Sequence, residues 1–327
     1  MQGENNLKKP LVSFIITYHN EPVKLLRECL DSIFALSLSN TEREIILVDD
    51  GSDEYPLNSL VEYRDSIIYL RQPNSGVSAA RNKGITMSTG EFIQFVDADD
   101  CIIPSGYEHC LDVVRFKNPD IVLFNFTQEG TDVDTPYFFD GPVTGSEYMR
   151  KNNLKASVCS YIFRKKSIIN LRFTEGIEFG EDEEFTAQLI LRTEKVYSTE
   201  TCAYYYRKRE NSVTNDTSTR SYIKRLNDTE HVIFYLGELA STLPNNEKIA
   251  LQRRVAQLTM DYLYNTIMQT HSKSQLDERI ERLRKQGLFP LPSREYTKKY
   301  KLFSKMVNSN TGRRILLYAL PFINPKP

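Results

Sequence analysis

Acidic residues gather directly after two apolar runs in the first part of the chain. Residues 97–100 read Asp-Ala-Asp-Asp and follow the apolar run 92–96, while an Asp-Asp-Gly-Ser-Asp sequence at 49–53 follows the apolar run 44–48. Carboxylates this close repel one another unless a cation lies among them. Hard oxygen ligands suit Mg²⁺ or Mn²⁺, which proteins often share with a substrate diphosphate. The spacing therefore predicts a metal and diphosphate site, although acidic triplets are also common in surface turns.

A third acidic group, Glu-Asp-Glu-Glu, begins at residue 181. The apolar residues Phe185, Leu189 and Ile190 that follow are spaced as one face of a helix. Negative side chains in the first turn of a helix are stabilised by the helix macrodipole. Taken in isolation, the segment is therefore interpreted as a solvated acidic first turn.

The elements expected to position these carboxylates alternate along the chain. The apolar runs 11–16, 44–48 and 92–96 predict buried strands, and each ends in polar residues. A helix is predicted to begin near residue 22, with Asn20 as its cap, because apolar residues then recur at three-and-four spacing. Ligands of open α/β sheets bind outside the carboxyl ends of the strands. We therefore expect the polar strand ends to lie at one edge of a sheet.

A further helix is predicted within 76–84, where small residues allow close approach to a sheet. It carries Arg81 and Lys83, which bring positive charge toward the acidic strand ends. For an arbitrary helix, Arg81 would be interpreted as a surface ion pair. That interpretation is disfavoured here because the helix starts beside three polar strand ends.

Together these segments resemble the inverting family 2 glycosyltransferases with the GT-A fold. The matching segments span about the first two-thirds of the chain, in the family's order: 12–17, 29–33, 46–52, 76–84 and 97–100. The resemblance implies an α/β fold in which helices flank a mixed, mainly parallel, Rossmann-like sheet. A helical C-terminal region is expected to follow this sheet.

In such enzymes the matching residues form a nucleotide-sugar site. The implied nucleotide-sugar contacts are Thr17, His19, Glu21, Asp50, Arg81, Asp97 and Arg209. The resemblance further implies that Asp99 coordinates Mn²⁺ or Mg²⁺, that Asp182 is the base for the acceptor hydroxyl, and that Glu181 supports the acceptor. Thr17 stands where proline is usual in the family, and His19 where tyrosine is common. Arg209 lies in the basic segment 204–214, for which a solvent-facing strand end is an equal alternative.

The character of the chain changes after residue 214. Residues 221–270 predict two helices broken at 243–246, so we expect a catalytic domain at 1–215 and a helical region at 216–327. Residues 272–327 hold thirteen Lys and Arg against four Asp and Glu, whereas the rest holds 29 against 39. This basic region could lie on an anionic membrane surface. A solvated helix with a short packed terminus is the alternative.

Composition narrows the class of protein. Hydrophobic residues make up 40% and charged residues 26%, as in soluble globular proteins. An apolar run of membrane-spanning length and an apolar signal core are lacking in the sequence, so a cytoplasmic protein is expected. The five cysteines are odd in number and are expected to be buried, reduced thiols. Near-neutral net charge and the lack of a recognised motif disfavour nucleic-acid binding.

The resulting hypothesis is a metal-dependent inverting glycosyltransferase. It would move a sugar from a nucleotide-sugar, with UDP favoured by the resemblance, to a saccharide or lipid-linked saccharide in cell-surface polysaccharide or glycan synthesis. A sugar nucleotidyltransferase is the second hypothesis, disfavoured because a Gly-rich phosphate loop followed by lysine is not found near the N-terminus. A catalytically silent saccharide-binding or scaffold protein on the same fold is the third. The pattern does not indicate which sugar, acceptor or oligomeric state applies.

Overall fold

The computed structural model describes residues 9–208, 216, 218–294 and 297–323. The chain divides into two compact units. The first, which we call the sheet unit, comprises Met1–Tyr148 and Lys155–Asn215. The second, the helical unit, comprises Met149–Leu154 and Asp216–Pro327. The predicted domains 1–215 and 216–327 are similar in extent, and as independently folding domains they stay a prediction.

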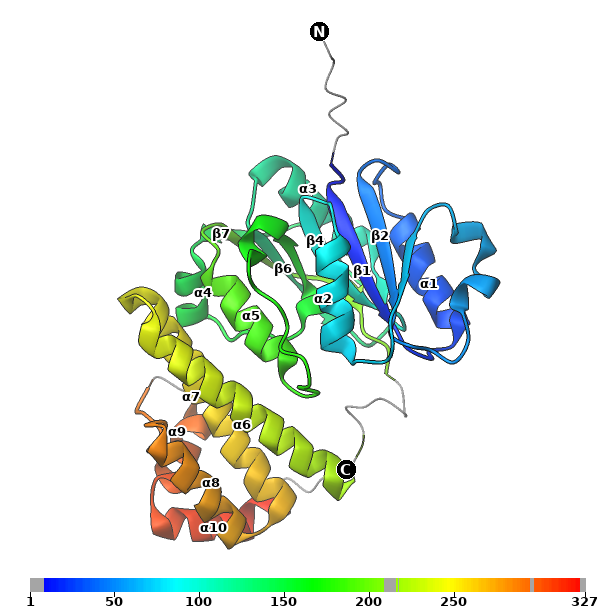
Figure 1. Cartoon of the computed structure of the whole chain (residues 1–327). Coiled ribbons are helices and arrows are strands. Elements are labelled where there is room, and N and C mark those ends of the chain that lie inside the picture. Colours follow the sequence, from blue (N-terminus) through cyan, green and yellow to red (C-terminus); the bar gives the residue numbers. More distant parts are fainter. Residues whose placement is uncertain (1–8, 209–215, 217, 295–296, 324–327) are drawn as a thin grey trace. The chain divides into compact units, whose positions relative to one another are not determined.

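Four parallel strands form the half of the sheet unit that carries the acidic strand ends (Figure 1). In sheet order they are β3 (Ile68–Arg71), β2 (Arg43–Asp49), β1 (Val12–Tyr18) and β4 (Phe92–Asp97). The register aligns Tyr18 with Asp49 and Thr17 with Asp97. The predicted strands are therefore confirmed, and their polar carboxyl ends meet at one edge as expected.

The other half of the sheet is mixed in direction. Next to β4 come β8 (Tyr161–Arg164), β6 (Ile121–Thr127), β9 (Val196–Tyr205) and β5 (Cys101–Ile102), with β7 (Asp140–Val143) also paired to β9. Strand β8 runs antiparallel to β4 and β6, whereas β6 and β9 are parallel. Pairing of β5 with the end of β9 brings residues 204–207 beside the turn at 97–100.

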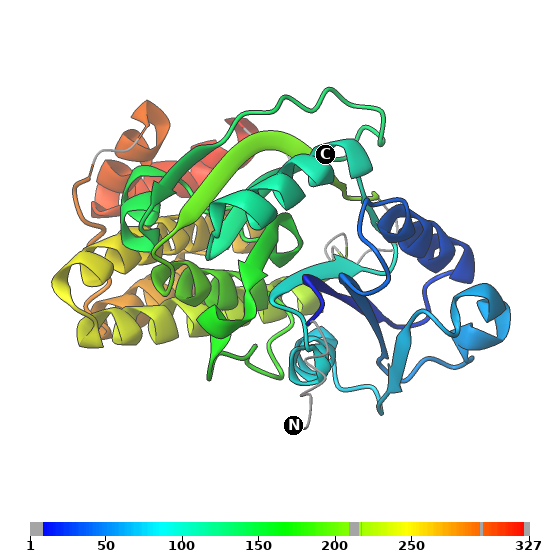
Figure 2. The same ribbon diagram turned by 90° about the horizontal axis from the view of Figure 1, so that it is seen from above.

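Helices cover both faces of this sheet (Figure 2). They are α1 (Val23–Phe34), α2 (Val77–Met87), α3 (Pro104–Lys117), α4 (Gly145–Lys151) and α5 (Glu181–Leu191), with short 3₁₀ helices at Pro56–Ser59, Val61–Tyr63, Val158–Ser160 and Lys165–Ile168. Phe14 contacts Tyr107 of α3. Its neighbour Ile15 packs against Gly84 of α2, where an added Cβ would lie 2.2 Å from Ile15 Cγ2. Because neighbouring strand residues point to opposite faces, α2 and α3 lie on opposite sides. The predicted α/β architecture is confirmed.

Helix α1 confirms one prediction and corrects another. Leu26, Cys29, Leu30 and Ile33 are buried, as their spacing predicted. Asn20 does not cap the helix, which begins at Val23 with Pro22 in the cap position. Asn20 instead adopts a left-handed φ of 60° and exchanges two hydrogen bonds with Asp53. Its side chain thus ties two strand-end loops together rather than a helix start.

Helices make up most of the described part of the helical unit. They are α6 (Thr219–Thr242), α7 (Asn245–Thr270), α8 (Lys273–Lys285), α9 (Lys298–Val307) and α10 (Asn310–Ile323). The break between α6 and α7 lies at Leu243 and Pro244, as predicted. Glu230 of α6 forms a buried network with Tyr262 of α7 and Arg279 of α8. Among the helices of the described residues, none has the length and apolar character needed to cross a bilayer.

Candidate active site

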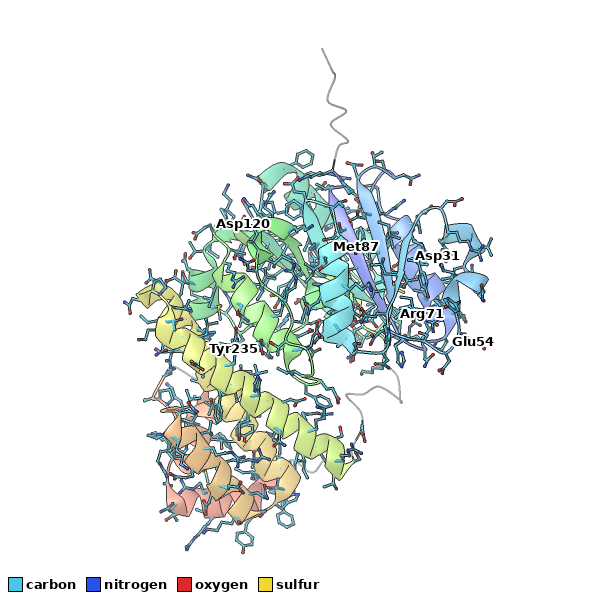
Figure 3. The ribbon with its side chains drawn as sticks, viewed as in Figure 1. Asp31, Glu54, Arg71, Met87, Asp120 and Tyr235 are labelled. Atoms are coloured by element: carbon cyan, nitrogen blue, oxygen red, sulfur yellow. The ribbon has the colours of Figure 1, made fainter. Side chains whose placement is uncertain are left out.

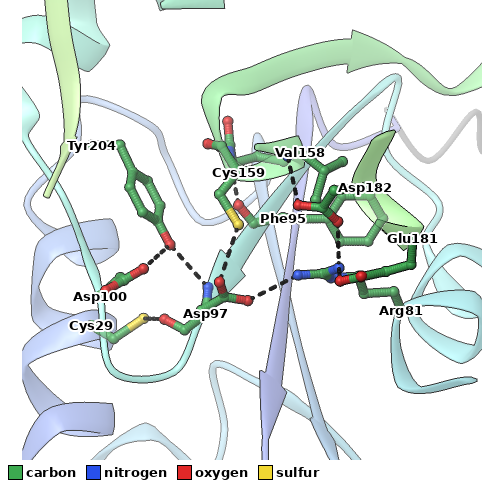
Figure 4. A network of polar contacts seen from close by, with 11 residues as sticks. Cys29, Arg81, Phe95, Asp97, Asp100, Val158, Cys159, Glu181, Asp182 and Tyr204 are labelled. Carbon is green, nitrogen blue, oxygen red and sulfur yellow. Dashed lines mark hydrogen bonds and ion pairs between the residues drawn. The ribbon is translucent and has the colours of Figure 1, made fainter. Parts of the chain in front are cut away.

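The turn after β4 is held by the end of β9 (Figure 4). The hydroxyl of Tyr204 accepts a hydrogen bond from the Asp97 amide at 3.1 Å and donates one to Asp100 Oδ2 at 2.8 Å. Arg207 donates its backbone N–H to Asp100 Oδ1 at 2.8 Å and its Nε–H to the Asp99 carbonyl at 2.9 Å. The acidic residues are thus fixed by contacts with a segment more than a hundred positions away in sequence.

The carboxylates of this turn repel one another. Burial, followed by the charges of Asp97 and Asp99, raises the pKa of Asp100 to about 8. A bound cation would relieve the part of this increase that comes from repulsion between the carboxylates. Among the residues that the structure describes, no group of three or more His, Cys, Asp or Glu side chains forms a metal cage. Mg²⁺ commonly uses one or two protein carboxylates together with substrate phosphates, so this acidic turn fits such an ion.

Arg81 of α2 joins the acidic turn to the first turn of α5. Its side chain is only 5% exposed and donates to Asp182 Oδ1 at 2.7 Å and to Glu181 Oε1 at 3.3 Å. Its other terminal nitrogen lies 3.3 Å from Asp97 Oδ1. Figure 4 shows the guanidinium between these carboxylates. Four of the predicted site residues therefore meet in one cluster, although they come from three separate elements.

The two acids at the start of α5 have altered proton affinities. Burial, and then the charge of Asp182, raises the pKa of Glu181 to about 7. Burial also raises the pKa of Asp182, while the Arg81 cation counteracts the increase. The Val158 amide donates to Asp182 Oδ2 at 3.2 Å, which holds the carboxylate in one orientation. A carboxylate whose pKa is raised by burial is better suited to take a proton from a hydroxyl than an ordinary exposed one.

The sequence interpretation missed the contribution of residues 158–159. Cys159 is buried and its thiol donates to Asp97 Oδ2 at 3.6 Å, while the Cys29 thiol lies 3.8 Å from the Asp97 carbonyl. Burial raises the pKa of both thiols, so they remain protonated. Spacing carried no signal for these contacts, because they depend on where β8 joins the sheet. The five cysteines are unpaired, and all but Cys202 are buried, in line with the expectation of reduced thiols.

Asp50 lies at the predicted edge and organises the start of α2. Its Oδ1 accepts hydrogen bonds from the Ser75 amide at 2.9 Å and the Gln72 side chain at 2.8 Å. Its Oδ2 accepts the amide of Gly76 at 2.8 Å, and Gly76 has a φ of 88° that favours glycine. The carboxylate therefore shapes the loop that leads to Arg81.

The loop after β1 lies beside this turn. His19 Nε2 is 3.1 Å from the side-chain nitrogen Nδ2 of Asn74, and the His19 backbone N–H donates to Glu21 Oε2 at 2.6 Å. Thr17 pairs with Asp97 across β1 and β4. Figure 3 shows Arg71 at the end of β3, where its guanidinium lies 4.1 Å from the Tyr55 ring centroid. Arg209, predicted as a nucleotide-sugar contact, lies outside the described residues.

Comparisons with known proteins show which family and fold this chain resembles. EpsJ of Bacillus subtilis, an uncharacterized glycosyltransferase, is 32% identical over 221 residues, which are 63% of this chain and 63% of EpsJ. Staphylococcus aureus TarS has a similar fold, with a TM-score of 0.68 at 17% identity over 93% of this chain and 54% of TarS. The TarS fragment 1–349 in complex with UDP-GlcNAc has a TM-score of 0.57 at 18% identity, over 91% of this chain and 90% of the fragment.

A third neighbour was solved with both a nucleotide-sugar and a metal. Mannosyltransferase PcManGT of Pyrobaculum calidifontis, in complex with GDP-Man and Mn²⁺, has a TM-score of 0.55 at 12% identity over 98% of this chain and 88% of PcManGT. These structural likenesses show the GT-A type of fold. The profile of the family described as "Glycosyl transferase family 2" matches residues 13–209, more than half of the chain. The protein therefore belongs to glycosyl transferase family 2.

Proposed function

We propose that the protein is a metal-dependent inverting glycosyltransferase that uses a nucleotide-sugar donor. The observation that carries the proposal is the Arg81 cluster, in which Asp97 of the acidic turn and the Glu181–Asp182 pair share one buried cation. A donor-side acid and a candidate base are thereby held together. Family membership supports the reaction class, and the TarS complex with UDP-GlcNAc supports UDP as the carrier.

Asp182 is proposed as the base. In the reaction its carboxylate takes the proton of the acceptor hydroxyl while that oxygen bonds to the anomeric carbon. The bond from this carbon to the diphosphate oxygen breaks, and the nucleoside diphosphate leaves from the opposite face. An α-linked donor would therefore give a β-linked product. Glu181 is proposed to position the acceptor, and the charge of Arg81 lowers the pKa of both carboxyls and so opposes the increase that their burial causes.

The donor is proposed to lie along the carboxyl ends of β1, β2 and β4. Thr17, His19 and Glu21 would border the nucleoside. Asp50 would contact its nucleobase, and Asp97 would lie near its ribose. Asp99 would hold Mn²⁺ or Mg²⁺, an ion that neutralises charge on the leaving diphosphate. PcManGT, solved with GDP-Man and Mn²⁺, supports the use of a divalent metal.

The acceptor is proposed to be a saccharide or lipid-linked saccharide, used in making a cell-surface polysaccharide or glycan. We place the protein in the cytoplasm, where its basic region 272–327 meets the anionic inner face of the membrane. The charge of that region supports this location, because it contains thirteen cationic residues and only four acidic ones.

A donor screen tests the proposed reaction. UDP-, GDP- and dTDP-sugars are incubated with the protein and Mn²⁺, Mg²⁺ or chelator, and released nucleoside diphosphate is measured with and without saccharide acceptors. Asp99→Ala should abolish metal-dependent release. Asp182→Asn should lower turnover by roughly 10²–10⁴-fold, the usual contribution of a general base. Glu183→Gln, a change at the neighbouring acid of the same turn, should stay within a few-fold of wild type.

Other outcomes identify the alternatives. Pyrophosphate release from a nucleoside triphosphate and a sugar phosphate would favour the sugar nucleotidyltransferase. Binding of saccharides without turnover or metal-dependent nucleotide binding would favour the silent scaffold. Equal losses in Asp182→Asn and Glu183→Gln would contradict the assignment of the base.

A further inference from the structure

Helix α10 exposes an apolar stripe in the helical unit. Ile315, Tyr318 and Phe322 are 50%, 78% and 83% exposed. Their three-and-four spacing places them on one face of the helix. Gly312 and Leu316, on another face, are buried. The exposed stripe is therefore a continuous feature of one helix, which otherwise packs through its small and aliphatic residues.

Such a stripe differs from ordinary scattered exposure. Single apolar residues on a protein surface need no explanation, whereas contiguous apolar patches mark interaction sites. Two of the three residues are aromatic, and aromatic rings favour the interface between water and lipid headgroups. Ile323, at the end of the helix, is 70% exposed and extends the apolar surface.

A small cationic hollow adjoins the same helix. It has a volume of about 140 Å³ and is lined by Lys273, Asp277, Asn310, Arg313, Arg314 and Leu317. Three cations thus face one carboxylate. Asp277 lies 3.2 Å from Lys273 and 3.7 Å from Arg313, so its charge is already shared. Arg314 has no ion pair with any residue in the described part of the chain, and it is exposed.

Cationic side chains are also frequent on the preceding helix. Lys298, Lys299 and Lys301 lie exposed in the first turn of α9, and within the described residues they form no ion pair. Leu302, which follows them, is 61% exposed. An exposed apolar stripe combined with unpaired cations is typical of helices that lie in the interface of an anionic bilayer.

We propose that α10 lies on the surface of an anionic phospholipid bilayer, with Ile315, Tyr318 and Phe322 among the headgroups and a lipid phosphate in the cationic hollow. Charge selects this occupant over a second copy of the chain, because two copies would bring two strongly basic regions together. The inference rests on the proposed function, since a lipid-linked acceptor would be presented at this surface.

Vesicle sedimentation of the full chain tests this surface. The probes are phosphatidylcholine vesicles with and without phosphatidylglycerol, at low and at high salt. Wild type should sediment only with the anionic vesicles. Tyr318→Ser combined with Phe322→Ser should weaken binding by roughly tenfold, because apolar area no longer enters the interface. Arg314→Gln should weaken it about fivefold, the usual effect of one cation near an anionic surface, and this loss should shrink at high salt.

Matched controls come from the sheet unit. Phe116 on α3 is 77% exposed, and its neighbour Lys117 is also exposed. Phe116→Ser and Lys117→Gln remove an exposed aromatic residue and an exposed cation outside the helical unit and should leave vesicle binding unchanged. Equal losses in these controls and in the α10 variants would overturn the proposed surface, as would wild type that binds no anionic vesicle.

Two further measurements separate the possible failures. Donor turnover without vesicles should be the same in all α10 variants as in wild type. If wild type turns over no donor, the enzyme proposal is overturned, while the vesicle measurement still tests the bilayer surface. Sedimentation velocity detects self-association. Dimers that dissociate in the Tyr318→Ser, Phe322→Ser variant, without vesicle binding by wild type, would assign the stripe to a second copy and overturn the bilayer.

Discussion

Replacing Arg81 with glutamine tests the centre of the proposed site. The side chain is 5% exposed and is the cation shared by Asp97, Glu181 and Asp182. Removing one partner of a buried ion pair leaves uncompensated charge and costs about 3–5 kcal/mol. For a protein of this size, that destabilisation lowers Tm by roughly 6–20 °C at neutral pH, since each kcal/mol shifts Tm by about 2–4 °C.

The pH dependence follows from the same cation. Arg81 lowers the pKa values of Glu181 and Asp182, so its loss raises both. A base works only when it is deprotonated, and the rising limb of kcat/KM against pH should therefore move to higher pH in Arg81→Gln. The stability difference from wild type should shrink at low pH, because protonated carboxyls no longer need a cation.

Lys83→Gln is the matched control for this experiment. Lys83 lies two positions further along the same helix and has no ion pair with a described residue. Its replacement by glutamine removes one positive charge, as Arg81→Gln does. Thermal unfolding and donor turnover are measured for both variants from pH 5 to pH 9. A similar Tm in Arg81→Gln and Lys83→Gln, or a rising limb that stays in place, would refute the role of Arg81.

Three more predictions concern stability. Glu181→Gln removes a group whose pKa is raised to about 7 from an ordinary 4.5, so wild type should lose stability relative to the variant as pH rises from 4.5 through 7, measured by urea unfolding. Tyr204→Phe should cost about 1–3 kcal/mol by removing a buried hydroxyl from the acidic turn, whereas Tyr205→Phe should be near neutral; equal costs would contradict this. Gly84→Ala would place a Cβ 2.2 Å from a β1 side chain and should cost about 1–3 kcal/mol by overpacking, while Gly237→Ala, with no atom nearer than 3.4 Å, should be tolerated in chemical denaturation.

Much of the fold could be predicted because its strands and helices carry local signals. The buried parallel strands read as continuous apolar runs, and the break between α6 and α7 follows from Pro244. Asn20 shows where local reasoning fails. Its residue type suits a helix cap, but the loop at Asp53 offers it two hydrogen bonds and a left-handed turn instead.

The candidate site was predictable only in its parts. The order of acidic and small residues made Asp97 and Arg81 candidates, and the resemblance implied the Glu181–Asp182 pair; the family profile agrees with that resemblance. Spacing could not indicate that Arg81 binds these acids, or that Cys159 and Tyr204 hold Asp97. Those contacts join residues separated by 16 to 107 positions, so no periodic pattern encodes them.

The amino-acid sequence alone therefore determined the class of fold, the acidic strand ends and the uneven distribution of charge, because each depends on residue types within short segments. Tertiary structure decided which carboxylates share Arg81, how far burial raises their pKa values, and which face of α10 remains exposed. These properties depend on distances between segments and on exclusion of water. Both arise only when the strands and helices have packed.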